Sequence, residues 1–465
     1  MVLILDRFAL AFVHMTRSAH ILLPLKLAAR FASSFHPNAL PARLQRNYAR
    51  ELLSWAFLPA MLAAIEGGTL SIVVGKAFAG QPGVTEGSLN LAIAWITAAP
   101  NLANTTSFIW AALSRGRGKV RFISTLQITT AILIALIALL PRDGTGLIGI
   151  CILAGIARAT WTGVITVRTA VWRNNYPKAD RATIAGKMAT VQALILAAAS
   201  LLVGQAMDIS PRNYQLLFPL LALIGLLGNQ IYATVRLTGG KKLMYAERAG
   251  RAGAVGLNPT GMLHLLKGDR LYAEFMGWMM LFGFGNLMLG PPIAYVLTQE
   301  LHTSYLEGIL VNSVIPLAVM PFAIPVWARL LDRSHVVAFR AVHGWAFVVA
   351  SALCTAATVL HSIWLFYAAG AAMGVGYAGG TLAWNLGHHD FAPADRDSDY
   401  MAVHVTLNGV RGLIAPIVAW GLYVWLAPLG YSGIVMLICT FVNIAGVLGF
   451  IAMRRKIRPI PPASP

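Results

Sequence analysis

YPKADR at residues 176–181 and FAPADR at residues 391–396 share one pattern: an aromatic residue, two further residues, and then Ala-Asp-Arg. Each stretch follows one long apolar segment and precedes another. A signature that recurs at the same place in the two halves of a chain indicates a duplicated unit. We therefore expect two copies of one arrangement, and the apolar segments decide which arrangement it is.

The composition indicates a membrane protein. Of the 465 residues, 57% are hydrophobic and 11% are charged, and the mean hydropathy is +0.68, which is outside the soluble globular class. The net charge of +19 would suggest a nucleic-acid ligand in a soluble protein, but the basic residues lie in short segments between apolar stretches, so no nucleic-acid partner is expected. Cys151, Cys354 and Cys439 are too far apart for a disulfide framework or a zinc cluster.

The apolar segments are long enough to cross a bilayer, because a spanning helix needs about 20 mainly apolar residues. Twelve are predicted, at residues 52–76, 88–113, 119–140, 145–170, 183–207, 214–235, 271–297, 304–330, 336–360, 363–386, 399–426 and 430–453. The basic, glycine-rich linker at 236–270 divides them six and six. We expect an all-α membrane protein with twelve transmembrane helices as two pseudo-symmetric six-helix bundles, at 51–235 and 271–453.

The distribution of positive charge predicts the orientation. Seven Lys or Arg residues precede the first span, seven lie in the linker, and four lie at 454–458, whereas the other side carries Lys76, Arg142 and Arg212. Both termini, the linker and the tail at 454–465 are therefore expected in the cytoplasm. We expect a monomer in a bacterial inner membrane. Residues 1–50 are interpreted as a cytoplasmic extension, either amphipathic on the membrane surface or disordered; a misassigned start codon is a further alternative.

A second pair of loops, ARLLDRSHVV at 328–337 and AALSRGRGKV at 111–120, occupies equivalent places between the second and third spans of each half. Here the chain resembles the major facilitator superfamily, whose loop motif is roughly G-x-L-a-D-R-x-G-R-R. Its core is matched by Leu330, Leu331, Asp332 and Arg333. Alanine replaces the leading glycine in both copies, and the first copy has no Asp. The resemblance covers about residues 50–455.

The resemblance implies a secondary transporter that rocks one six-helix half against the other. It also implies that acids and bases in these loops hold the halves together on the cytoplasmic side. Because the first copy of the motif is degenerate, we expect Asp332 and the two ADR loops to carry more of this function. The predicted gating residues are Asp180, Arg181, Asp332, Arg333, Asp395 and Arg396.

Two opposite charges are expected near mid-depth in the membrane. Glu66 lies about 14 residues into the first predicted span and Arg158 about 13 residues into the fourth. An ionisable group at the bilayer centre costs roughly 3 kcal/mol or more, so each is a functional candidate. The resemblance places both helices around a central cavity. One alternative is a fixed ion pair without a transport role; the other makes Glu66 the proton-coupling acid and Arg158 its switchable partner.

Arg411 and His404 lie on one face of the eleventh predicted span. Arg411 has no acid at its depth on the same helix, so it is a candidate docking point for an anionic substrate. The alternative is that it packs against carbonyls or Asn side chains. His404, and His343 in the ninth span, could shuttle protons or be satisfied structural histidines.

Polar and aromatic residues at similar depths are predicted to complete a substrate pocket: Trp161, Asn286, Trp384 and Asn385. The GPP at 290–292 should break or kink the seventh helix. His388, His389 and Asp390 could bind a metal, but no second ligand cluster is evident, so neither a metal nor another cofactor is expected. No Walker loop occurs, which argues against ATP as the energy source.

The sequence as a whole favours a proton-coupled carrier for a small solute in the lipid bilayer, and the mid-depth arginines suggest an organic anion. The Trp and Met content favours, as an alternative, export of amphiphilic or drug-like compounds. A membrane enzyme such as an acyltransferase would need a His, Asp or Ser constellation near the interface, for which HHDFAPADRD at 388–397 is the nearest candidate. A transporter-shaped sensor that moves nothing is a third alternative. We do not expect an enzyme.

Overall fold

The computed structural model describes residues 33–249, 259–301, 303, 307–308, 310–426, 429 and 432–457. Most of the predicted N-terminal extension, at 1–32, and the middle of the linker, at 250–258, lie outside the described residues. All elements of regular structure in the described part are helical. The fold class predicted from the apolar segments is therefore confirmed.

The first half is built from a short 3-10 turn and nine helical segments: η1 (Pro37–Ala39), α3 (Ala42–Trp55), α4 (Leu58–Leu62), α5 (Gly67–Phe78), α6 (Glu86–Asn104), α7 (Ser107–Ser114), α8 (Lys119–Ile137), α9 (Gly144–Asn175), α10 (Lys178–Ile209) and α11 (Tyr214–Tyr232). The linker contributes α12 (Gly240–Ala249) and α13 (Thr260–Gly268). The segments predicted as spans in this half correspond to the end of α3 with α4 and α5, to α6 with α7, and to α8, α9, α10 and α11.

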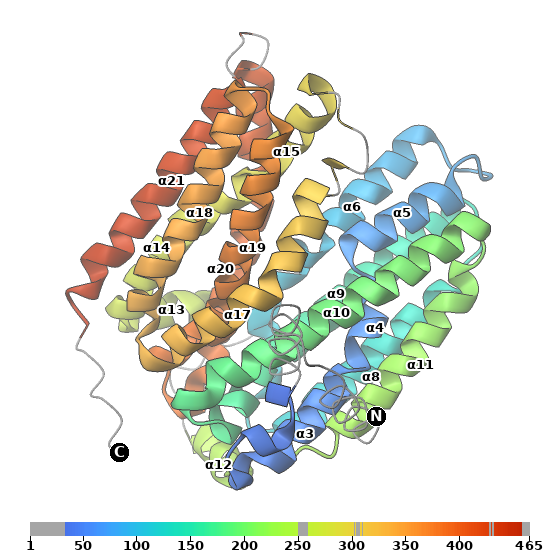
Figure 1. Cartoon of the computed structure of the whole chain (residues 1–465). Helices are drawn as coiled ribbons and strands as arrows, with labels where there is room; N and C mark the ends of the chain where they lie inside the picture. The colour runs from blue at the N-terminus through green and yellow to red at the C-terminus, as the bar shows by residue number, and fades with distance from the viewer. Residues whose placement is uncertain are drawn as a thin grey trace, which may run out of the picture.

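The second half repeats the arrangement with α14 (Arg270–Met288), α15 (Gly290–Tyr295), the π-helical turns η2 (Val296–Glu300) and η3 (Leu310–Val314), α17 (Ile315–Arg333), α18 (Val336–Val359), α19 (Ile363–Leu386), η4 (Gly387–Asp390), η5 (Ala394–Arg396), α20 (Asp397–Leu426) and α21 (Ser432–Arg454). In the described residues, eight helices are long and apolar enough to cross a membrane. Figure 1 shows α3–α11 as one bundle and α14–α21 as a second bundle beside it.

The first span differs from the continuous helix predicted at 52–76. It is broken twice, after Trp55 and between Leu62 and Gly67. Pro59 stands in the first turn of α4, where its missing N–H costs no hydrogen bond, and Glu66 has extended backbone angles (φ −66°, ψ 130°) as the N-cap of α5. The predicted break at the GPP is also present, because α14 ends at Met288 and α15 begins at Gly290.

The two halves pack closely where α20 crosses α6. A Cβ on Gly412 would lie 2.4 Å from the side chain of Asn101, and one on Gly409 would lie 2.6 Å from the carbonyl oxygen of Asn101. Glycine at these two positions allows the helices to touch, and the Asn101 amide donates to the Gly412 carbonyl at 3.3 Å. This contact turns one face of α20 toward the first half and the opposite face into the second bundle.

Candidate functional site

A cavity of about 470 Å³ lies between the two halves. Its walls come from α3, α9 and α10 on one side and from α17 and α19 on the other: Trp55, Trp161, Ile165, Arg168, Gln192, Met320, Tyr377, Gly380, Thr381, Trp384 and Asn385. Three predicted pocket residues, Trp161, Trp384 and Asn385, are among them. The cavity therefore has aromatic walls, a few amide and hydroxyl groups, and one positive charge.

Arg168 supplies that charge. Its guanidinium lies between two indoles, with its carbon 4.6 Å from the ring centre of Trp55 and 4.4 Å from that of Trp172. Nη2 donates to the side-chain oxygen of Asn385 at 3.2 Å, which joins the two halves, and Nε has no hydrogen-bond partner. Arg168 is only 5% exposed, so its charge is held rigidly at the edge of the cavity.

Glu51 lies behind Arg168 and was not singled out from the sequence. It is fully buried, and it accepts hydrogen bonds from the indole of Trp172 at 2.7 Å and the hydroxyl of Tyr176 at 3.0 Å. Its carboxyl also interacts electrostatically with Arg168. Neither residue stands out in the sequence, because Glu51 precedes the first predicted span and Arg168 is close to the end of the fourth.

Glu66 and Arg158 form the predicted ion pair, with Nη1 of Arg158 3.1 Å from Oε2 of Glu66. The Glu66 side chain is 40% exposed, while that of Arg158 is 13% exposed. The pair lies within the first half, at the break between α4 and α5, and neither residue lines the central cavity. The carboxyl is therefore accessible while its partner is mostly covered.

The remaining pocket candidates lie inside the second bundle. Arg411 donates to the Met279 carbonyl and to the side chain of Asn408, which is the packing arrangement considered as the alternative to docking. His343 bonds the Gly376 carbonyl through Nε2 at 2.7 Å. Asn286 on α14 and His404 on α20 do not line the cavity either.

A larger hollow, of about 930 Å³, lies elsewhere, between the start of α6 and the start of α9. Its lining includes exposed apolar side chains, among them Leu91, Ile148 and Ile152, and little polar surface. Such a surface fits contact with lipid tails. The smaller central cavity is the better candidate site, because both halves and a buried charge contribute to it.

One end of the interface between the halves is closed by a group of charged and polar residues, here called the latch. It consists of Arg173, Lys178 and Arg181 from the first half with His388, His389, Asp390 and Asp397 from the second. Arg173 lies 3.2 Å from Asp397, and Lys178 pairs with Asp390, whose other oxygen accepts from the Val336 amide at 2.7 Å. Arg181 donates to Nδ1 of His389 at 3.2 Å.

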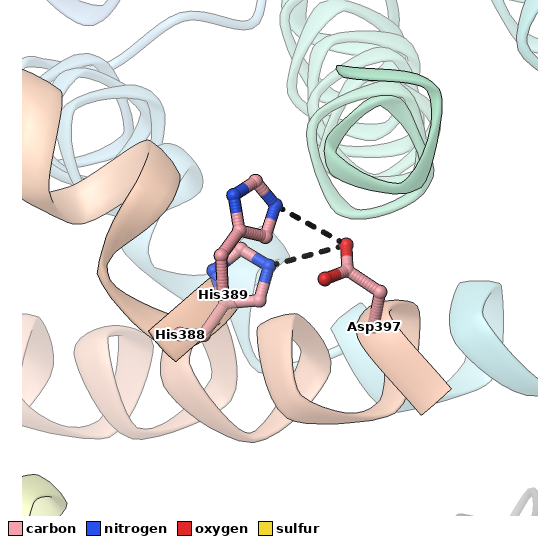
Figure 2. Close-up of side chains that lie close together, drawn as sticks. All are labelled: His388, His389 and Asp397. Atoms are coloured by element: carbon pink, nitrogen blue, oxygen red, sulfur yellow. Dashed lines mark hydrogen bonds and ion pairs between the residues drawn. The ribbon is translucent and has the colours of Figure 1, made fainter. Parts of the chain in front are cut away.

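Figure 2 shows how the two histidines of the latch meet Asp397. Nε2 of His388 lies 3.4 Å and Nε2 of His389 lies 3.3 Å from the same carboxylate oxygen. Because Arg181 donates to Nδ1 of His389, the proton of the neutral ring is on Nε2 and faces Asp397. Burial lowers the pKa of His389 to about 3, against the opposing effect of Asp397, so this ring is neutral near pH 7.

The same three residues have the spacing of a metal site, since their ligand atoms all lie within 4.8 Å of one another. The surrounding charges argue against one. Arg173 already neutralises Asp397, and Arg181 brings a second positive charge to His389. A cation would be repelled by both guanidinium groups, so the arrangement fits hydrogen-bonded charge pairing across the halves better than metal binding.

Further contacts extend the closed end, and several of the predicted gating residues take part. Asp332 accepts from the amides of Ala182 and Thr183 at 2.7 and 3.0 Å, which holds α17 to the start of α10. Arg115 pairs with Asp399, and Arg396 lies 3.6 Å from the same carboxylate. In the described part of the chain, no ion pair is found for the other three predicted gating residues, Asp180, Arg333 and Asp395.

The linker is tied to the same end. Glu247 on α12 pairs with the buried Lys119 at 2.7 Å and accepts from the backbone amide of Gly116 at 2.8 Å. Gly116 has φ +65°, which glycine adopts without strain, so the loop between α7 and α8 can turn tightly under α12. The linker therefore covers the loop at 111–120, which is the first and degenerate copy of the loop motif.

Comparison with known proteins identifies similar folds. No protein-family model and no curated protein sequence matches the chain. Among solved structures, the human organic anion transporter MFSD10 is 13% identical with a TM-score of 0.62, covering 88% of this chain and 100% of the other. The major facilitator superfamily proton:xylose symporter XylE is 13% identical, with a TM-score of 0.62 and coverage of 87% and 95%.

Two bacterial structures are similar to the same degree. A bacterial homologue of the iron transporter ferroportin, in an outward-facing state, is 12% identical with a TM-score of 0.62, covering 88% of this chain and 99% of the other. The Escherichia coli fucose:proton symporter FucP is 13% identical with a TM-score of 0.62 and coverage of 88% and 98%. The similarity extends over nearly the whole of each chain, and at these identities it concerns the fold.

Proposed function

We propose that this chain, which has the fold of the major facilitator superfamily, is a secondary transporter that moves a small organic anion across the membrane by alternating access. One observation carries the proposal: a cavity between the two halves contains a buried cation, and the interface is closed at one end by ion pairs between the halves. A cavity at the interface of two repeats is where such carriers bind substrate.

The proposed orientation places the latch on the cytoplasmic side. The latch adjoins the linker through Arg115 and Asp399, and the linker and both termini carry half of the Lys and Arg residues. Closure at this end means that the cavity is reached from the opposite, external side. The structure then corresponds to an outward-facing state, and rupture of the latch would accompany the change to the inward-facing one.

The cavity chemistry supports an anion with an apolar or aromatic part. The planar fork of Arg168 matches a carboxylate or phosphate, while Trp55, Trp161 and Trp384 offer flat apolar faces. MFSD10, one of the matched proteins, is an organic anion transporter. The three tryptophans also favour a second candidate function, export of amphiphilic compounds, which needs the aromatic faces but not the charge.

Proton coupling is the second part of the proposal. The accessible Glu66 carboxyl can take up a proton when its pair with Arg158 opens, and release it when the pair forms again. XylE and FucP, both with the same fold, are proton symporters. Glu51 is a further candidate, because it is buried beside the cation that would contact the substrate.

Flux measurements in proteoliposomes test the function directly. The purified full-length protein is offered a panel of aromatic and aliphatic carboxylates, sugars and cationic dyes, with and without a pH gradient. We expect carboxylate flux that a pH gradient accelerates and that sugars do not inhibit. Flux of dyes but not of carboxylates would support the amphiphile exporter instead. Absence of flux for every class under every gradient would rule out the carrier.

Glu66→Gln is expected to abolish gradient-driven accumulation while leaving downhill exchange of the same anion within about threefold of the unmodified protein, because only the protonatable group is removed. The measurement compares two quantities in each variant: the accumulation ratio of the anion under a pH gradient and its exchange rate without one. Glu86→Gln, at an exposed position in the first turn of α6, is the matched control and should behave like the unmodified protein. Intact accumulation in Glu66→Gln with loss in Glu51→Gln would transfer the coupling role to Glu51.

A further inference from the structure

The core of the second bundle contains a group of positive and potentially positive side chains outside the central cavity. Arg340 on α18 and His404 on α20 are each 3% exposed, and Arg411 on α20 is 7% exposed. Arg340 and Arg411 lie close enough to repel each other, and His404 interacts electrostatically with both. On α20, His404 and Arg411 are seven residues apart and so share the face that is turned away from the first half.

These charges have no acidic partner. No ion pair of the described residues involves Arg340 or Arg411. Arg411 donates to the Met279 carbonyl and to Asn408, and Arg340 donates to Nδ1 of His343 at 3.4 Å, all of which are neutral groups. Two buried arginines that repel each other and bond only to neutral partners are electrostatically incomplete.

The group also has free hydrogen-bonding capacity. Nε of Arg340 and Nε of Arg411 have no partner, and both ring nitrogens of His404 have none. A neutral histidine still carries one N–H, so three N–H donors in this core are unsatisfied. Buried polar groups are nearly always satisfied, and two of these three unsatisfied donors belong to positively charged guanidinium groups. An anion supplies both the missing acceptor and the missing charge.

The duplicated half shows that the fold does not need these residues. When the two halves are aligned on their repeated loops, the counterparts are apolar: Ile123 for Arg340, Ala189 for His404 and Leu196 for Arg411. Ile123 is fully buried in its own bundle. The space for the Arg411 guanidinium also depends on a glycine of α14, since a Cβ on Gly283 would lie 2.0 Å from Nη1 of Arg411. The polar group is therefore an addition to the second half.

We propose that a small monovalent anion, of the size of a halide or a short carboxylate, binds in the second bundle between α14, α18 and α20, held by Arg340, His404 and Arg411. This site is separate from the transport cavity, which none of the three residues lines. Trp384 separates the two, because it lines the cavity and makes an edge contact with the ring of His404, with centroids 5.9 Å apart.

Anion-dependent stability of the full-length protein tests the site. Tm is measured in detergent at constant ionic strength while sodium gluconate is replaced by chloride, bromide, nitrate or acetate. We expect a rise in Tm of about 3 °C or more with the small anions relative to gluconate. Crystals grown in bromide should show an anomalous peak beside Arg411. Equal Tm in all salts and no bromide peak would overturn the proposal and leave water as the occupant.

Two variants locate the effect. Replacing the three residues by their counterparts, in Arg340→Ile/His404→Ala/Arg411→Leu, should abolish the anion dependence in a protein that still folds, since the first half packs with these side chains. Arg168→Met, which removes the cation of the central cavity, should keep it. Loss of the anion effect in Arg168→Met alone would assign the ion to the transport cavity and contradict the second site. Should the triple variant fail to fold, Arg340→Ile replaces it: this variant should lose the anion dependence of Tm and the bromide peak, and retention of both would contradict the site.

Discussion

Arg168→Ala should reduce anion transport by roughly 10- to 100-fold while leaving the protein folded in the membrane. Arg168 is the cation among the described residues that line the central cavity, and loss of a charged hydrogen bond worth about 1.5 to 3 kcal/mol corresponds to roughly 10- to 100-fold in affinity. Arg168→Lys keeps the charge but loses the planar fork and the stacking between Trp55 and Trp172. Its transport rate should therefore lie between the rates of the unmodified protein and of Arg168→Ala.

Initial flux and substrate affinity of both variants are the measurements, made on protein that elutes as a single peak. Arg121→Ala, at an exposed position on α8, is the matched control and should transport at the normal rate. The substrate class gives a second readout: the flux of anions should fall far more in Arg168→Ala than the flux of neutral analogues of the same shape. Equal loss for both would assign Arg168 a structural role and weaken the anion proposal, and normal anion flux in Arg168→Ala would contradict it.

The difference between the predicted and the observed site has a physical origin in how depth is judged from a sequence. Glu66 and Arg158 were found because each lies about midway along an apolar segment, and their ion pair followed from the cost of burying either one alone. Arg168 lies only a few residues from the end of an apolar segment, where charges are common. In the structure α9 continues to Asn175, and the first half encloses Arg168 with Trp55 and Trp172, so burial comes from tertiary packing that composition does not reveal.

The fold was more accessible than the site, for a related reason. Twelve apolar segments and a repeated loop signature are properties of the chain itself, and they specify the two bundles. The helix break at Glu66 and the pairing of charges between the loops depend on how the helices pack in three dimensions. Arg181 of the repeat and Asp332 of the second pair of loops make contacts between the halves, but the acid that meets Arg173 is Asp397, two residues beyond the repeated Asp395.

Asp397→Asn should open the latch. Its carboxylate lies within 3.4 Å of Arg173, His388 and His389. Removing one partner of a buried charge pair typically costs about 3 to 5 kcal/mol, which changes the ratio of two conformations by roughly 100-fold or more. We expect most molecules to leave the state that is closed at this end. Asp395→Asn, with the same chemical change two residues away and no ion pair in the described part of the chain, should leave the populations unchanged.

Spin labels on the two ADR loops report the opening. The alanines of the repeat, Ala179 and Ala394, are both exposed and lie on opposite halves, so the pair Ala179→Cys/Ala394→Cys can be labelled in a Cys151→Ser background. The distance distribution should move to longer values in Asp397→Asn and not in Asp395→Asn. A distribution that stays short in Asp397→Asn would mean that Lys178, Asp390 and Asp332 close this end without the His–Asp cluster.

Acidification should open the same latch without a mutation, and its direction follows from His389. The ring is neutral in the closed state, where burial lowers its pKa to about 3, whereas a ring exposed to water has a pKa near 6.5. The groups that face it are Asp397, which favours the proton, and His388 and Arg181, which oppose it. The open state therefore binds more protons between these two pKa values, and the closed state loses stability as the pH falls below about 6.5.

His389 alone contributes a loss of about 2 kcal/mol at pH 5, since each pH unit below 6.5 contributes about 1.4 kcal/mol, and by itself this would raise the open population roughly 30-fold relative to pH 7.5. Asp332 opposes this shift, because burial in the closed state raises the pKa of its carboxyl to about 6, so the net rise should be smaller. The spin-label distances measured from pH 7.5 to pH 5 give this population directly. His389→Gln keeps a hydrogen-bonding side chain but cannot titrate, so this variant should not open on acidification over this range. If His389→Gln opens with the same pH profile, another group controls the latch, and the buried neutral histidine is not its proton switch.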